Sequence, residues 1–140
     1  MSEFPRIAVV DDDESIREAL QSLLLSCGHR ATVYTLAEDF LQSVHLPNTA
    51  CLIVDVWMPR MSGLELQQQL TMAHCPIPLI FITAHEDEET RGRALRAGAV
   101  DFLYKPFSAE VLLSAVHVAL QSFRGGREGS HRLTTTSWSP

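Results

Sequence analysis

The chain has 140 residues, 46% of them hydrophobic and 20% charged, which is the composition of a single globular domain. Its formal net charge of -6 argues against a nucleic-acid-binding surface, which would need clustered basic residues. No apolar run reaches the roughly 18 residues of a membrane-spanning helix, and the N-terminus lacks the apolar segment of a signal peptide. Because Cys27, Cys51 and Cys75 are scattered, we interpret them as reduced thiols in a cytoplasmic protein.

Apolar runs and amphipathic stretches alternate five times along the chain. The apolar runs predict buried strands at 7–10, 31–34, 51–54, 78–82 and 100–104. The amphipathic stretches predict helices at 15–26, 36–44, 63–70, 87–97 and 109–123. With right-handed crossovers, this pattern predicts an α/β fold in which a parallel, doubly wound sheet of five strands carries helices on both faces.

Several residues predict how these helices begin, end and pack. Ser62 and Ser108 can cap the start of the third and fifth helices, and Gly28 and Gly98 can end the first and fourth. The core-facing residues are predicted to be Ile16, Ala19, Leu20, Leu23 and Leu24 in the first helix and Leu112, Ala115, Val116 and Ala119 in the last. The sequence after residue 123 loses this periodicity, which predicts a domain at 1–123 and a flexible tail or linker at 124–140.

Polar residues stand at the ends of four predicted strands. Asp11 and Asp12 follow the first strand, Asp55 the third, Thr83 the fourth and Lys105 the fifth. The carboxyl ends of parallel strands lie along one edge, where open α/β sheets bind ligands, so we expect these side chains to converge. Each also has a purely structural explanation. The acids and Thr83 could cap turns or helices, and Lys105 could be a solvated charge.

Carboxylates held close together repel one another unless a cation intervenes. Magnesium suits such a site, because it prefers one or two carboxylates together with water and a phosphoryl group. Lys105 is the only lysine in the chain, and it stands where a second positive charge is needed. At ~4 Å and an effective dielectric constant near 20, its attraction to one negative charge is about 4 kcal/mol.

Residues 5–123 resemble the receiver domain of two-component response regulators, most of all those of nitrogen-fixation-type and NarL-type transcription factors. Five motifs occur in the family's order and spacing, namely Val10-Asp11-Asp12, Asp55 with Met58-Pro59 and Ser62-Gly63, Thr83-Ala84, the run Gly98 to Phe102, and Lys105-Pro106. The resemblance implies a flavodoxin-like or CheY-like sheet of strand order 2-1-3-4-5. It also implies a phosphorylation-activated signalling protein without turnover of a free substrate.

The resemblance implies a role for each matching residue. Asp55 would accept a phosphoryl group from a sensor histidine kinase, while Thr83 and Lys105 would contact that group. Asp11, Asp12, Asp55 and the Trp57 backbone carbonyl would hold Mg²⁺.

The resemblance also gives expectations for neighbouring residues. The Lys105–Pro106 bond would be cis, and Phe102 would be a switch residue that fills the space vacated when Thr83 moves. Trp57 and His85 could screen the acyl phosphate from water, and Asp13 could cap the first helix.

Two further hypotheses concern a rival activity and the output surface. Ile7 to Val10 followed by Asp11 and Asp13 also resembles a haloacid-dehalogenase-type phosphatase, in which Asp11 would be the nucleophile and Asp13 the acid or base. That alternative leaves the Asp55–Gly63 segment unexplained. The charged helix after Thr83 predicts either a solvated surface or a phosphorylation-dependent homodimer through residues 86–123.

Overall fold

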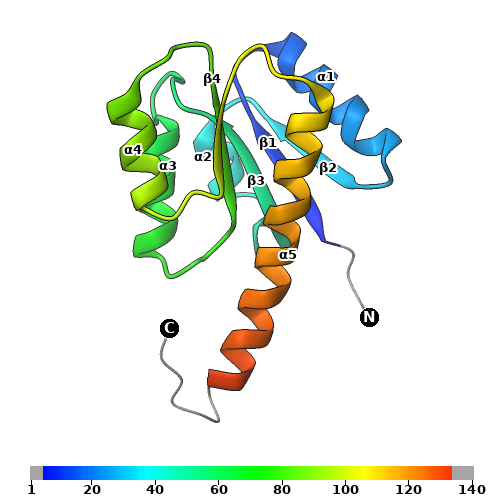
Figure 1. Ribbon diagram of the computed structural model, residues 1–140, viewed down its shortest axis with the longest axis vertical. Helices are drawn as coiled ribbons and strands as arrows, with labels where there is room; N and C mark the ends of the chain where they lie inside the picture. Colours follow the sequence, from blue (N-terminus) through cyan, green and yellow to red (C-terminus); the bar gives the residue numbers. More distant parts are fainter. Residues whose placement is uncertain (1–4, 134–140) are drawn as a thin grey trace.

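The computed structural model describes residues 5–133 and shows a five-stranded parallel sheet (Figure 1). The strands are β1 (Arg6–Val10), β2 (Arg30–Tyr34), β3 (Thr49–Asp55), β4 (Leu79–Thr83) and β5 (Asp101–Tyr104). Their order is β2-β1-β3-β4-β5, which places β3 in the centre and β5 at one edge. The predicted fold class and strand order are therefore confirmed.

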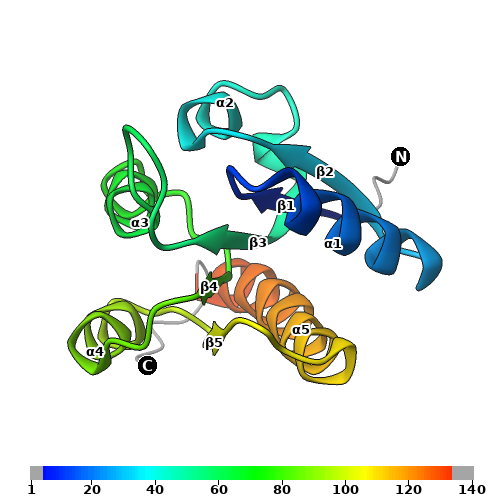
Figure 2. The same ribbon diagram turned by 90° about the horizontal axis from the view of Figure 1, so that it is seen from above.

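Helices cover both faces of this sheet. They are α1 (Glu14–Ser26), α2 (Ala37–Leu41), α3 (Gly63–Met72), α4 (Glu88–Arg96) and α5 (Ala109–Leu133), with a 3₁₀ turn η1 (Leu46–Asn48) before β3. Figure 2 shows α1 and α5 on one face of the sheet and α2, α3 and α4 on the other. None of the helices in the described part of the chain is long and apolar enough to span a membrane.

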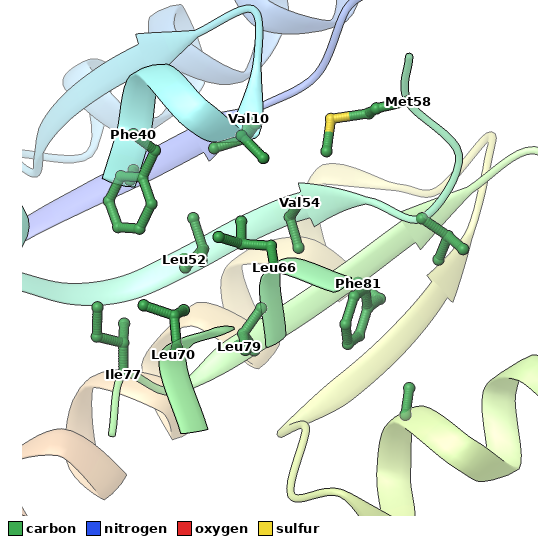
Figure 3. Close-up of a cluster of buried hydrophobic side chains, with 14 of the residues drawn as sticks. Val10, Phe40, Leu52, Val54, Met58, Leu66, Leu70, Ile77, Leu79 and Phe81 are labelled. Atoms are coloured by element: carbon green, nitrogen blue, oxygen red, sulfur yellow. The ribbon is translucent and has the colours of Figure 1, made fainter. Parts of the chain in front are cut away.

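The central strand β3 is buried along its whole length, because helices cover the sheet on both sides. Alternate residues of the strands therefore point to opposite faces and pack into two separate apolar cores. The core under α1 and α5 contains Leu20, Leu24, Leu112, Ala115, Val116 and Ala119. The core under α2, α3 and α4 is built around Phe40, Leu52, Leu66, Leu70 and Phe81 (Figure 3).

Side chains cap four of the helices at their N-termini. Asp13 accepts hydrogen bonds from the first-turn amides of α1, and Asp87 does the same for α4. Ser62 forms a reciprocal capping box with Glu65 at the start of α3. The Ser108 hydroxyl accepts from the Val111 amide in the first turn of α5. The predicted caps at positions 13, 62 and 108 are thus confirmed.

Gly28 and Gly98 end α1 and α4 as predicted. Their φ angles are +87° and +108°, a region in which a side chain would be unfavourable. The following amides then turn back to the helices, since the His29 N–H donates to the Leu24 carbonyl and the Ala99 N–H to the Ala94 carbonyl, both at 3.0 Å.

The structure corrects three details of the sequence prediction. Helix α2 ends at Leu41, well before residue 44, because the Ser43 hydroxyl pairs with the Tyr34 hydroxyl and accepts from the His45 amide. In α1, Ala19 is exposed, although it was predicted to face the core.

Helix α5 continues to Leu133, ten residues past the predicted end at 123. Glycine lowers helix stability by only about 1 kcal/mol, so a pair of glycines does not have to end a helix that is already formed. The last part of the predicted flexible tail, residues 134–140, lies outside the described residues.

Candidate functional site

The strands bring the predicted polar residues to one edge of the sheet. Asp55 is the last residue of β3 and Thr83 the last of β4, while Asp11 and Lys105 directly follow β1 and β5. Asp11, Asp55 and Thr83 are all buried. Four residues that lie far apart in sequence thus meet at the carboxyl ends of four strands, as the parallel topology requires.

Lys105 bridges the two buried acids. Its Nζ lies 3.0 Å from Asp11 Oδ2 and 2.9 Å from Asp55 Oδ2. The lysine side chain is itself only 15% exposed, so water screens these ion pairs weakly. The ammonium group of the chain's only lysine therefore holds both carboxylates in a fixed position.

The other oxygen of each acid accepts a hydrogen bond from the backbone. The Asp13 N–H donates to Asp11 Oδ1 at 2.9 Å, and the Trp57 N–H donates to Asp55 Oδ1 at 3.0 Å. Each carboxylate is thus oriented by one amide and one ammonium contact, and Asp55 retains lone pairs that could attack or bind.

Burial and neighbouring charge shift the pKa values of two of these groups. Burial raises the pKa of Asp11 above its ordinary value, and the charge of Asp55 adds to this, while the Asp13 amide and Lys105 oppose it. Burial alone would lower the pKa of Lys105, but its hydrogen bonds to Asp55 and Asp11 outweigh burial and raise it. Lys105 therefore stays protonated. A further positive charge nearby would stabilise the charged form of Asp11.

Asp12 completes an acidic cluster with Asp11 and Asp55. One carboxylate oxygen from each of the three lies within 4.8 Å of the others, a spacing that could hold a metal ion. Asp12 is exposed, whereas the other two are buried, so the cluster opens to solvent on one side. An all-oxygen set with an open side fits Mg²⁺, which keeps several waters when it binds to proteins.

Thr83 and the residues around it form the second half of the site. The Thr83 hydroxyl accepts a hydrogen bond from the His85 amide at 3.1 Å, which leaves its own proton free to donate. Trp57 and His85, the two predicted screening residues, are both exposed beside the site. The predicted switch residue, Phe102, is already buried, with 5% of its surface exposed.

Two features of the site region were not predicted from the sequence. Arg17 of α1 donates from Nη1 to the Asp11 carbonyl oxygen at 2.8 Å. Arg60, in the loop after Asp55, has a φ of +71° and pairs through Nε with Glu38 of α2 at 3.4 Å. Neither residue belongs to a short motif, so only the folded chain shows these contacts. The Lys105–Pro106 bond is cis, as the resemblance implied.

The fold and the residues at its carboxyl edge define a receiver domain, a signalling module activated by phosphorylation. The family model of the response regulator receiver domain matches residues 7–117, and the chain belongs to this family. The sequence prediction of a receiver domain of the two-component system is therefore confirmed.

Named relatives place the chain among bacterial regulators. The response regulator protein TodT of Pseudomonas putida is 42% identical over 128 residues, covering 91% of this chain and 56% of TodT. The transcriptional regulatory protein FixJ of Azorhizobium caulinodans is 37% identical over 133 residues, covering 94% of this chain and 63% of FixJ. The solved structure of the response regulator StyR is 43% identical, with a TM-score of 0.83, and the match covers 95% of this chain and 69% of that one. The chain thus spans a little over half the length of the curated relatives it matches.

Proposed function

We propose that Asp55 is the phosphoryl acceptor of this receiver domain. It is the buried acid at the end of the central strand, and the Trp57 amide and Lys105 hold its carboxylate in one orientation. The single observation that carries the proposal is the contact of Lys105 with both Asp55 and Asp11. A phosphoryl group on Asp55 would add negative charge, and a fixed cation beside this buried carboxylate would stabilise that charge.

The chemistry follows from these positions. A carboxylate oxygen of Asp55 attacks the phosphorus of the donor, and the bond to the donor's leaving group breaks with its electron pair. When the donor is the phosphohistidine of a sensor kinase, the leaving imidazole takes up a proton. Lys105 and the Thr83 hydroxyl then contact the phosphoryl oxygens, one as a charge and the other as a hydrogen-bond donor.

Asp11, Asp12 and Asp55 would hold Mg²⁺, together with the Trp57 backbone carbonyl. The oxygen cluster with one open side supports this assignment. When bound, the ion would spread the negative charge that builds up on the transferring phosphoryl group. We further propose that the exposed side chains of Trp57 and His85 limit access of water to the acyl phosphate.

This function does not require turnover of a free substrate. The rival phosphatase activity is not supported by the comparisons, which identify a receiver domain. Its proposed acid or base, Asp13, caps α1 through contacts with the Ser15 and Ile16 amides. We therefore propose a phosphoryl acceptor that acts on itself.

A sensor histidine kinase is the proposed donor, and a second copy of the chain is the proposed partner of the active form. Arg93 and Arg96 of α4 are exposed, and Val111 and Val118 expose about half of their surface on α5. Charged and apolar groups on neighbouring elements suit a two-fold contact. We propose no direct contact between this domain and nucleic acid. The free thiols of Cys27, Cys51 and Cys75 support a cytoplasmic location.

Labelling with acetyl phosphate and Mg²⁺ tests the proposal, because it needs no identified kinase. We expect one phosphoryl group per chain by intact mass, and borohydride reduction should place it on Asp55. Asp55→Asn should lose the label, while Asp39→Asn, an exposed control on α2, should keep it. Full labelling of Asp55→Asn at another aspartate would contradict the assignment, and steady release of phosphate without accumulation would favour a phosphatase.

A further inference from the structure

Side-chain contacts orient the two buried acids of the site, but they do not orient Asp12. Asp11 and Asp55 each contact Lys105 and accept a hydrogen bond from one backbone amide. Asp12 is exposed, and among residues 5–123 no hydrogen bond or ion pair orients its carboxylate. One oxygen of Asp12 nevertheless belongs to the cluster of three acids, so its direction depends on the backbone that carries it.

Arg17 fixes the backbone directly before Asp12. Its guanidinium donates from Nη1 to the Asp11 carbonyl oxygen at 2.8 Å. Asp11 is fully buried, and a buried carbonyl group needs such a donor. The Asp11 carbonyl and the Asp12 N–H belong to one planar peptide group, so the bond that fixes the carbonyl also fixes the plane from which Asp12 extends.

Helix α1 brings Arg17 to this carbonyl. The Arg17 N–H donates to the Asp13 carbonyl at 3.0 Å, which places Arg17 one turn into the helix. The side chains of a helix lean toward its N-terminus, and α1 begins directly after the residues Asp11 to Asp13. The guanidinium is therefore directed back to the segment that carries the acids.

The charge of Arg17 would act on the site in the opposite direction. A guanidinium stays protonated in proteins, and its positive charge would repel Mg²⁺ at the acidic cluster. If Arg17 acted only through its charge, its removal would strengthen Mg²⁺ binding. If it acts through the Asp11 peptide group, its removal would weaken Mg²⁺ binding. The direction of the change therefore distinguishes the two effects.

We propose that Arg17 is a positioning residue for the Mg²⁺ site, an inference that rests on the proposed function. It holds the peptide group between Asp11 and Asp12 so that the Asp12 carboxylate is directed toward the cluster before the ion binds. The ion then does not have to order this segment, and preorganisation of this kind strengthens binding. Arg17 acts through the backbone and does not contact the ion.

Titration with Mg²⁺ alone tests the proposal. In a Trp138→Phe background, Trp57 is the only tryptophan, and its fluorescence reports binding. Arg17→Met should raise the Kd for Mg²⁺ roughly tenfold, as is typical when a residue that orients a metal ligand is lost. Arg17→Lys keeps both a positive charge and a donor, so its Kd should lie between those of Arg17→Met and the unchanged protein.

Arg6→Met is the matched control. Arg6 is also half-buried and also donates from Nη1, in this case to the Thr32 hydroxyl at 3.1 Å. It is the first residue of β1, at the opposite end of the strand from the acids. Its substitution removes the same charge and one hydrogen bond, and it should leave the Kd for Mg²⁺ unchanged.

Thermal unfolding separates positioning from a purely structural role. A residue that only fastens α1 to the end of β1 would lower the Tm of the metal-free protein and leave the Kd for Mg²⁺ unchanged. We expect the Tm gain on adding Mg²⁺ to be smaller in Arg17→Met, because weaker binding stabilises the folded state less. If Arg17→Met does not fold, Arg17→Gln, which removes the charge and shortens the side chain, carries the same expectation.

The outcomes separate the inference from the proposed function. An unchanged or lower Kd for Mg²⁺ in Arg17→Met would overturn the role of Arg17 and leave the proposed function standing. Equal weakening in Arg6→Met would also overturn it, because the effect would then not depend on the Asp11 carbonyl. No Mg²⁺ binding by the unchanged protein would overturn the proposed metal site together with the inference built on it.

Discussion

At the residue scale, the site contains more negative than positive charge. Lys105 is the only lysine of the chain, and it neutralises part of the charge of Asp11 and Asp55. Two buried carboxylates share one ammonium group, so the three side chains still carry a net negative charge. Burial raises the pKa of Asp11 above its ordinary value, and the charge of Asp55 adds to this. The residual negative charge would be stabilised by the proposed Mg²⁺.

Neighbouring acids in the same run have different roles, which gives a sharp prediction about the metal. Asp12→Ala should weaken Mg²⁺ binding roughly tenfold or more and stop phosphorylation, because it removes a proposed ligand. Asp13→Ala should leave Mg²⁺ binding nearly unchanged and destabilise the fold by about 1 kcal/mol, because Asp13 caps α1. Titration followed by Trp57 fluorescence in a Trp138→Phe background measures the first effect, and urea unfolding measures the second. Equal loss of Mg²⁺ affinity in both variants would contradict the assignment of Asp12 as a ligand and Asp13 as a helix cap.

At the element scale, the turn between β3 and α3 determines the position of Asp55 at the end of the strand. The Gly63 N–H donates to the Val56 carbonyl at 2.9 Å, so α3 begins in direct contact with the strand end. A Cβ atom at Gly63 would lie 2.5 Å from the Asp55 carbonyl oxygen and 3.1 Å from the Val56 Cα, both of them backbone atoms. Only glycine allows this approach, and Ser62 then caps the helix from the adjacent position.

Substitutions at these adjacent positions should separate stability from function. Gly63→Ala should destabilise the fold by about 1–3 kcal/mol and slow acetyl phosphate labelling, since its methyl group displaces the end of β3. Ser62→Ala should remove only the capping box, at about 1 kcal/mol, and should leave the labelling rate unchanged. Urea unfolding and labelling kinetics on both variants check this. A Gly63→Ala protein that labels at the normal rate would show that the strand end tolerates the shift.

At the scale of the whole molecule, the proposed output surface lies on α4 and α5, and α4 follows the strand that ends at Thr83. Helix α4 starts five residues after Thr83, with Asp87 as its cap, and carries basic residues in its last turn. The contacts of Asp87 with Thr90 lower the pKa of this carboxyl, so the cap stays charged at neutral pH. The Arg91–Glu88 pair, at 3.9 Å on the surface, contributes little to stability, which leaves these charges free to contact a partner.

We predict that the unphosphorylated chain is a monomer and that beryllium fluoride with Mg²⁺ promotes self-association. A new ionic contact at a partly buried site could provide the few kcal/mol that such a shift requires. Arg91→Glu or Arg96→Glu should weaken the dimer and leave Asp55 labelling intact, since both residues lie on α4, which carries none of the acids of the cluster. Sedimentation at increasing concentration is the measurement. A beryllofluoride form that stays monomeric would show that this surface faces a different protein.

The sequence by itself determined the alternation of strands and helices, the family and the residues at the strand ends. Periodicity and capping signals are local, so Ser62, Ser108 and Gly28 could be interpreted without a structure. The convergence of Asp11 and Asp55 also followed from topology alone, because all parallel strands end at the same edge.

Only the tertiary structure decided how those groups share contacts. Distances between side chains depend on packing across elements far apart in sequence. For that reason the bridge of Lys105 to both acids and the Arg17 contact could not be predicted. The early end of α2 at Leu41 has the same origin, since it depends on a hydrogen bond between Ser43 and Tyr34 of a neighbouring strand.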